Sequence, residues 1–169
     1  GYHMFDKGDY VNYSTSGICQ IEDICFMSFG KNSKGHNYYI LKPVSQEGES
    51  IFVPIDNEKL IDRMKPVLTP KEIDDIILSI KDEDLIWIDD RKQRIKKFHD
   101  ILLKRDEKEL LMLASCLYLR STETKKGISS TEQEILKTAE SAIDQEFSFV
   151  LHLSAQDIGI YIRKKLGIE

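Results

Sequence analysis

The residues whose types and spacing point most directly to a function lie between Trp87 and Lys97. The stretch holds the only tryptophan of the chain, and five of the seven residues from Arg91 to Lys97 are basic in a protein whose formal net charge is -5. A local reversal of charge can meet phosphate groups. The alternative is a tryptophan packed at the start of a helix that carries a solvated basic face. This stretch alone leaves both interpretations open.

Length and composition limit the class of protein. A chain of 169 residues can form one domain or two small ones, and 41% hydrophobic with 31% charged residues is ordinary for a globular protein. The acidic balance argues against a protein that coats nucleic acid by charge alone. We therefore expect any contact with nucleic acid to be local and assisted by another partner.

The chain has no apolar run long enough to span a bilayer and no opening signal segment, so we expect a soluble, cytoplasmic protein. The first three residues, 1–3, are expected to be a cloning remnant ahead of a native Met4. The cysteines are odd in number and, like the histidines, scattered. This spacing favours reduced thiols over a disulfide framework or a metal site.

The first part of the chain, from Phe5 to about Pro66, carries strand signals. Short runs with alternating, β-branched or aromatic residues are separated by Gly, Ser and Asn turns. They predict strands over 10–13, 18–24, 37–41 and 51–53. Several short strands in so few residues predict a small, strongly bent antiparallel sheet or barrel.

The second part carries helix signals. Thr69, Pro70 and Glu72 have the spacing of a capping box with proline at the first helical position. Four further helices are predicted, over about 88–103, 106–120, 129–153 and 154–166, the last with a capping box from 154 to 157 and an end at Gly167. The predicted fold is α+β with two domains, a β domain over 1–66 and an all-α bundle of about five helices over 67–169.

A helical wheel separates the residues that follow Trp87. Ile95, Phe98 and Leu102 fall in one sector with Arg91, whose stem we expect to pack on the bundle, and Arg94 lies at the margin. The candidate phosphate contacts on the opposite side are Lys92, Lys96 and Lys97. The secondary candidates are Lys125, Lys126 and Lys137, each of which has surface solvation as its alternative.

Other candidate sites are less well supported. The sequence has no phosphate loop, no Ser, His and Asp set in a recognisable context, and no His-Glu-x-x-His motif. The acidic pairs at Asp74 and Asp89 lie near helix N-termini, where the helix dipole favours them structurally. We therefore expect neither an enzyme nor a cofactor site. The run 51–53 is the best candidate edge for strand addition, with Phe52 facing away from Ile51 and Val53.

The chain resembles the CarD/CdnL-type bacterial transcription factors, whose N-terminal domain also occurs in transcription-repair coupling factors. The resemblance rests on the opening run 5–13 with Gly17, on 21–24, 38–42 and Val53-Pro54, and on Trp87 followed by basic residues, then Ser130-x-x-Gln133 leading to Ala139. It covers nearly the whole chain from Met4 to about Leu153. Helicase motifs are absent, which favours a stand-alone regulator over a coupling factor.

The resemblance implies a Tudor-like or SH3-like N-terminal barrel that binds the β subunit of RNA polymerase, and a helical domain that meets promoter DNA at the upstream edge of the bubble. It implies that Trp87 is a minor-groove wedge. Here Ile88, Asp89 and Asp90 separate Trp87 from its basic followers, and Met27 and Phe52 stand where some relatives have basic residues. The residues expected to bind the polymerase are Met27, Ile51, Phe52, Val53 and Pro54.

Two functions follow as expectations. The first is a non-enzymatic regulator, tethered to the polymerase, that stabilises the open promoter complex and binds DNA only weakly and without sequence specificity when free. The second is a protein adaptor that never touches DNA, with Trp87 in the bundle core. The DNA-contacting set is Trp87, Arg91, Lys92, Arg94, Lys96, Lys97, Lys125, Lys126 and Lys137. The oligomeric state is open, and exchange of a segment between chains at the hinge from Pro66 to Pro70 is one alternative.

Overall fold

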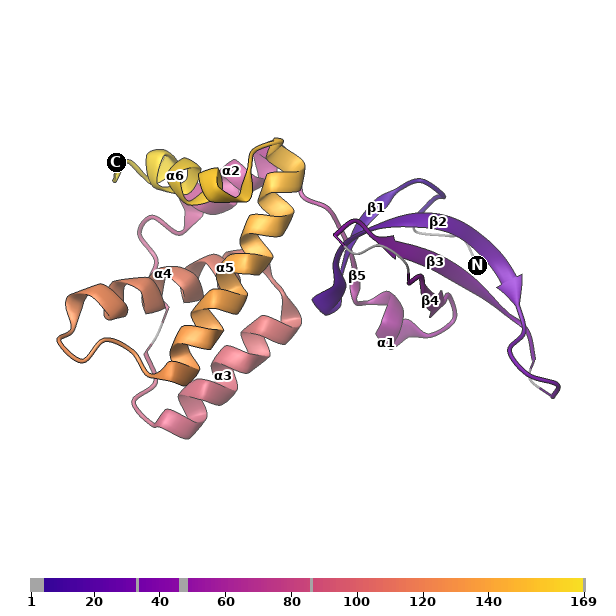
Figure 1. Ribbon diagram of the computed structural model, residues 1–169, viewed down its shortest axis with the longest axis horizontal. Helices are drawn as coiled ribbons and strands as arrows, with labels where there is room; N and C mark the ends of the chain where they lie inside the picture. Colours follow the sequence, from indigo (N-terminus) through magenta and orange to yellow (C-terminus); the bar gives the residue numbers. More distant parts are fainter. Residues whose placement is uncertain (1–4, 33, 46–48, 86, 169) are drawn as a thin grey trace. The chain divides into compact units, whose positions relative to one another are not determined.

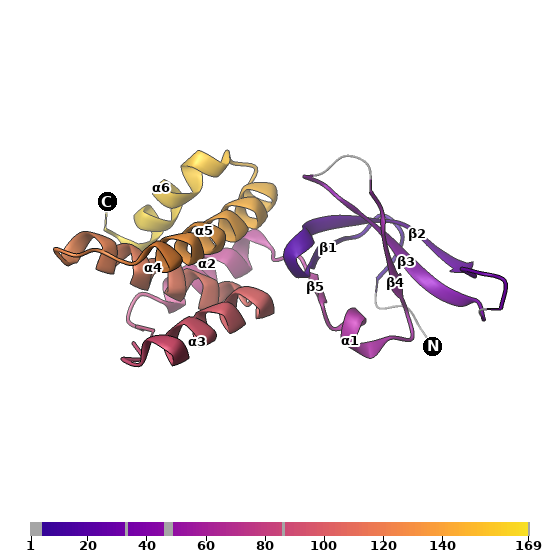
Figure 2. The same ribbon diagram turned by 60° about the horizontal axis from the view of Figure 1, so that its bottom comes forward.

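A computed structural model describes residues 5–32, 34–45, 49–85 and 87–168. The chain divides into two compact units, Gly1–Val67 with the strands and Leu68–Glu169 with most of the helices (Figures 1 and 2). The predicted α+β class is confirmed. The predicted boundary at Pro66 lies beside this division, and independent folding of the two units stays a prediction.

The first unit contains one antiparallel sheet in the order β4-β3-β2-β1-β5. Its strands are β1 (Tyr10–Tyr13), β2 (Gly17–Met27), β3 (His36–Pro43), β4 (Ile51–Pro54) and β5 (Met64–Pro66). Figure 1 shows β2 and β3 as a long, bent pair. In the described residues no pairing of β4 with β5 closes the sheet, so the predicted closed barrel is not confirmed.

Alternation along the strands builds the core of this unit. Val11, Tyr13, Tyr39, Leu41 and Val53 are buried on one face, because successive side chains of a strand point to opposite faces. The four longer strands lie where alternation predicted them. The sequence did not predict β5, whose three residues are too few to show alternation, or the short helix α1 (Glu58–Ile61), which Asn57 caps.

The second unit contains five helices within the described residues. They are α2 (Pro70–Ser79), α3 (Arg91–Lys104), α4 (Glu107–Glu123), α5 (Ser130–Leu151) and α6 (Ala155–Leu166). The long helix α5 packs against each of the other four. Ile73, Phe98, Leu113, Phe147 and Ile158 are among the fully buried side chains of this core. No helix of the described chain is long and apolar enough to cross a membrane.

Side-chain caps fix where the helices begin. Thr69 with Glu72 forms the predicted capping box, and Ser129 with Glu132 forms another. In both, each side chain bonds the other residue's backbone N–H. Asp90 accepts a hydrogen bond from the Gln93 N–H at 2.9 Å, so α3 begins at Arg91 rather than Ile88. Residues 87–90 therefore precede the helix.

One further prediction about the helices needs correction. The capping box at Ser154 does not form, because the Ser154 hydroxyl donates to the Asp157 carboxylate at 2.9 Å instead of accepting from the backbone. The helix α6 still ends at Gly167, which has a positive φ of 75°. The inner stripe of α3 is centred on Phe98 and Ile101, both buried, whereas Ile95 and Leu102 are half-buried.

Asp74 joins two helices, a role that differs from the helix-dipole charge that the sequence predicted. Its carboxylate accepts a hydrogen bond from the Tyr161 hydroxyl and lies 3.3 Å from the Lys165 ammonium group. Burial, with the Asp74 carboxylate, raises the pKa of Tyr161 to about 12. These contacts hold α6 on α2.

Candidate functional site

Trp87 is half-buried at the edge of the helical core. Its ring packs on Phe98, with the two ring centroids 6.0 Å apart. The guanidinium carbon of Arg120 lies 3.4 Å from the indole centroid, and that of Arg94 lies 4.4 Å away. Each of these cation–π contacts is worth about 0.5–2 kcal/mol, depending on how far it is desolvated. The only indole of the chain is thus tied to α3 and α4 by one aromatic and two cationic neighbours.

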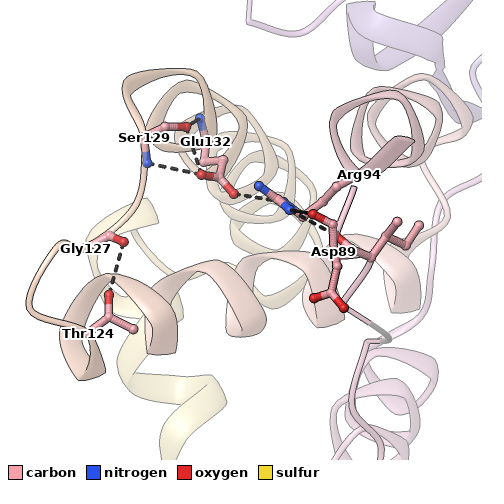
Figure 3. Close-up of polar contacts among 7 residues, drawn as sticks. Asp89, Arg94, Thr124, Gly127, Ser129 and Glu132 are labelled. Atoms are coloured by element: carbon pink, nitrogen blue, oxygen red, sulfur yellow. Dashed lines mark hydrogen bonds and ion pairs between the residues drawn. The ribbon is translucent and has the colours of Figure 1, made fainter. Parts of the chain in front are cut away.

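Arg94 holds the segment that carries Trp87. Its Nη1 donates to the backbone carbonyl of Ile88 at 2.9 Å and to that of Asp89 at 3.1 Å. Its Nε forms an ion pair with Glu132 Oε2 at 3.4 Å, and the two side chains are only 11% and 7% exposed. Figure 3 shows Arg94 reaching from α3 toward Glu132 at the start of α5. One guanidinium therefore fixes both the entry to α3 and the contact of α3 with α5.

Glu132 is also held from its other side. Its Oε1 accepts hydrogen bonds from the Ser129 N–H at 3.1 Å and from the Ser129 hydroxyl at 2.8 Å. Burial disfavours the ionised carboxyl, but the bonds from Ser129 and the charge of Arg94 outweigh it and hold the pKa of Glu132 below its ordinary value. Glu132 is consequently an ionised, buried partner for Arg94 at neutral pH.

The sequence left Arg94 open between a structural role and contact with DNA, and the structure gives it the internal contacts. Arg91, whose stem was expected to pack on the bundle, is exposed, whereas Arg94, placed at the margin, makes the internal contacts. Direct DNA contact by either residue stays a prediction. The lysines predicted to meet phosphate are all exposed, namely Lys92, Lys96, Lys97, Lys125, Lys126 and Lys137.

A second candidate surface lies on the first unit. β4 occupies one end of the strand order, so its outer edge has no partner strand within the described residues. Phe52 points away from the core and is 42% exposed, while Val53 is fully buried. This edge can accept another extended segment through its backbone N–H and C=O groups.

Three aromatic rings gather beside that edge, and we call them the aromatic cluster: Phe29, Tyr38 and Phe52. Their centroids lie 5.5 Å (Phe29 to Tyr38), 5.6 Å (Phe29 to Phe52) and 6.4 Å (Tyr38 to Phe52) apart, each pair edge to face. Because Phe52 pairs with Ile40 across the sheet, Tyr38 is its diagonal neighbour on the outer face. Phe29, which follows β2, is 52% exposed and completes the cluster.

The other predicted docking residues surround this cluster. Ile51 and Pro54 are half-buried in β4, and Met27 is half-buried at the end of β2. Val53 can contribute only its backbone because its side chain is in the core. Sequence reasoning did not find Phe29, which lies outside the predicted strands, or the outward role of Tyr38. An aromatic residue next to a glycine-rich turn was the only signal for the former.

A metal site needs several acidic, histidine or cysteine side chains that lie close together. Within the described residues, no group of three or more His, Cys, Asp or Glu side chains is placed to hold a metal ion. Cys19, Cys25 and Cys116 are free thiols. Burial raises the pKa of Cys19 to about 11 and also raises the pKa of Cys116. Such thiols carry little thiolate at neutral pH and make poor nucleophiles.

The first unit matches a known family. Residues 5–65 match the sequence model of the CarD-like/TRCF RID domain. This unit therefore belongs to the CarD-like/TRCF RID domain family, which confirms the resemblance drawn from its residues. The match covers the first unit alone, and the part of the resemblance that rests on the second unit stays a prediction. The aromatic cluster and β4 lie inside the matched region. A search of curated proteins found no match to the chain.

Proposed function

We propose that this protein is a non-enzymatic transcription regulator that binds the β subunit of RNA polymerase through its first unit. Its helical unit then contacts promoter DNA at the upstream edge of the bubble and stabilises the open complex. The observation that carries the proposal is the family match over 5–65, which contains an unpartnered edge strand with Phe52 exposed beside it. Such an edge supplies backbone hydrogen bonds, and the rings supply apolar contact area.

The DNA contact is proposed for Trp87 and the exposed lysines of α3, Lys92, Lys96 and Lys97. Tethering to the polymerase gives the helical unit an effective DNA concentration that can approach the millimolar range, so a weak intrinsic affinity suffices. Differential binding of about 1–3 kcal/mol would shift the open fraction roughly 5- to 150-fold. A free protein of net charge -5 should accordingly bind linear duplex weakly and in a salt-sensitive way.

The internal contacts of Trp87 set the energy that its role as a wedge would cost. To stack on an unpaired base, the indole must give up contact with Arg94 or Arg120. Base stacking is worth about 1–3 kcal/mol, which is comparable with the cation–π contacts that it would replace. Trp87 therefore exchanges one set of partners for another at little net cost, and the freed guanidinium can meet a phosphate.

The second candidate is a protein adaptor without DNA contact. The half-buried position of Trp87 against Phe98 and the helical core favours it. In that case the lysines of α3 are a solvated face, and Trp87 only stabilises the bundle. Promoter opening by a Trp87→Ala variant that remains folded separates the two functions.

The experiment for the polymerase contact is a binding titration of the full chain against isolated β subunit. We expect Phe52→Glu to weaken binding by at least about 30-fold, as for an interface hot spot. Val44→Glu is the matched control, because Val44 is similarly exposed, at 46%, on the same unit outside the aromatic cluster. Equal binding by the wild type and Phe52→Glu would exclude docking through this edge.

A further inference from the structure

The helical unit contains an apolar groove that the proposed function does not use. It lies between α4, α5 and α6 and has a volume of about 250 Å³. Leu111 and Ala114 of α4, Ile143 of α5, and Ile162 and Leu166 of α6 line its walls. Ligand pockets are commonly apolar concavities with a few polar groups, of about 300–1,000 Å³. At about 250 Å³ this groove falls just below that range, so it suits a small molecule better than a polypeptide segment.

Two carboxyl groups lie on one wall of the groove, Glu140 and Asp144, one turn apart on α5. In the described part of the chain neither forms an ion pair. Burial raises the pKa of Glu140, and burial together with the charge of Glu140 raises the pKa of Asp144 to about 6. Asp144 is half-buried and Glu140 is exposed, and the two charges repel each other when both groups are ionised.

The other polar groups of the groove do not remove this cost. Arg163 of α6 and Tyr118 of α4 also line it, with Ser115. Neither Arg163 nor Tyr118 is among the groups that shift the pKa of the two carboxyls. Two like charges beside an apolar concavity lower stability, and groups with shifted pKa values in such concavities are enriched at functional sites.

We infer that this groove binds a small organic cation whose apolar body fills the space between α4, α5 and α6 and whose ammonium group pairs with Asp144 and Glu140. An anionic ligand would add a third negative charge, and a neutral ligand would leave the two carboxylates unpaired. Nucleic acid is excluded from this face by the same charges.

The charge of the pair makes binding depend on pH. A cation binds the ionised carboxylates, so its affinity rises as pH increases through about 6, where Asp144 loses its proton. The charged and titratable groups that face the site are Glu140 on the same helix, Arg163 on α6 and Tyr118 on α4. A ligand with the same body and no charge lacks this dependence.

The test uses three probes with one apolar body: 4-phenylbutylamine, 4-phenylbutanol and 4-phenylbutyrate. Each is titrated into the ¹⁵N-labelled full chain at pH 7.5 and at pH 5, and amide shifts locate the site. We expect millimolar affinity for the amine, as is usual for a fragment of this size. At pH 7.5 the amine should bind about tenfold more tightly than the alcohol, and the butyrate should bind most weakly.

Variants separate the carboxylates from the apolar walls. The double variant Glu140→Gln with Asp144→Asn should bind the amine no better than the alcohol. Glu134→Gln changes an exposed carboxylate of α5 that does not line the groove, and it should bind the amine as the wild type does. Thermal unfolding of each variant confirms that it is folded.

Three results would overturn the inference. The first is equal affinity for the three probes, which would make the groove merely apolar. The second is shifts confined to residues outside α4, α5 and α6. The third is an amine affinity that the double variant leaves unchanged.

Discussion

The aromatic cluster of the first unit and the Trp87 region of the second both offer aromatic rings, but they hold them differently. Phe29 and Phe52 are exposed and lie edge to face against each other and against Tyr38. Trp87 is half-buried, packs on the core at Phe98, and lies against two guanidinium groups. The cluster is thus available to a partner without rearrangement. Trp87 must first exchange internal contacts.

The contact of the aromatic cluster with its partner and the contact of Trp87 with DNA therefore differ in their free-energy cost. A preformed apolar surface that gains a partner loses little conformational entropy, so it suits a tether that must bind first. Trp87 loses about 1–2 kcal/mol of internal contacts when its indole becomes exposed. It therefore binds only where a new contact replaces that energy, such as at an unstacked base. The comparison predicts that substitutions at the cluster change binding, while substitutions around Trp87 change stability as well.

The largest expected effect falls on the buried pair that holds the Trp87 segment. Glu132→Ala leaves the Arg94 guanidinium buried without its carboxylate and removes the capping box at Ser129. The free energy of unfolding should fall by about 3 kcal/mol, measured by urea denaturation. Lys71→Ala, which breaks the exposed pair of Lys71 with Asp75, is the control and should cost under about 0.5 kcal/mol. Equal costs would show that the buried network is not structural.

Truncating one ring in each region tests the comparison itself. Trp87→Ala should lower the free energy of unfolding by about 2 kcal/mol, less than a fully buried tryptophan, and leave affinity for the β subunit unchanged. Phe29→Ala should cost under about 1 kcal/mol of stability and lower that affinity about tenfold. Denaturation and binding titrations measure both. If Phe29→Ala lowered stability but left affinity for the β subunit unchanged, Phe29 would be a structural residue and not a binding residue.

A change of pH should affect the helical unit through Asp144, whose pKa is about 6 in the folded chain against an ordinary 3.8. Folding disfavours the ionised form, so Asp144 costs stability above pH 6, and this cost is lost as pH falls through 6 toward 4. Asp144→Asn should therefore stabilise the protein by about 1 kcal/mol at pH 7.5, a value reduced for partial solvent exposure. The gain should vanish near pH 4. A gain of equal size at both values would point to packing instead.

The smallest effect is expected from removing the Arg120 guanidinium, which lies over the indole of Trp87. Arg120→Gln removes a guanidinium 3.4 Å from the ring, and acrylamide quenching of fluorescence from Trp87, the only tryptophan, should increase. The accompanying loss of stability should be about 0.5–1 kcal/mol. Arg91→Gln is the control because Arg91 is exposed. Unchanged quenching in Arg120→Gln would mean that the stacked arrangement is not populated in solution.

Local signals predicted much of the fold. The caps at Thr69, Asp106 and Ser129 are read from neighbouring residues, because a capping side chain bonds a backbone group three positions on. Alternation in β4 likewise predicted that Phe52 faces outward and Val53 inward. The failure at Ser154 is informative, since its hydroxyl had a competing acceptor in Asp157.

The site was less predictable because its contacts join residues far apart in the chain. Nothing near Trp87 indicates that Arg120 of another helix covers it, or that Phe29 and Tyr38 meet Phe52. A helical wheel cannot separate Arg91 from Arg94 when the choice depends on Glu132. Long-range packing decides those roles, and a periodic pattern contains no information about it.

The lifetime of the open complex tests the central claim most directly. Purified polymerase on a linear promoter is challenged with competitor after addition of wild type, Trp87→Ala, Phe52→Glu or Val44→Glu. The account predicts that wild type and Val44→Glu lengthen the lifetime about 5- to 150-fold and that Trp87→Ala loses most of this effect while still binding the β subunit. It also predicts that Phe52→Glu acts only at far higher concentration. A folded, β-bound Trp87→Ala variant with the full effect would contradict it.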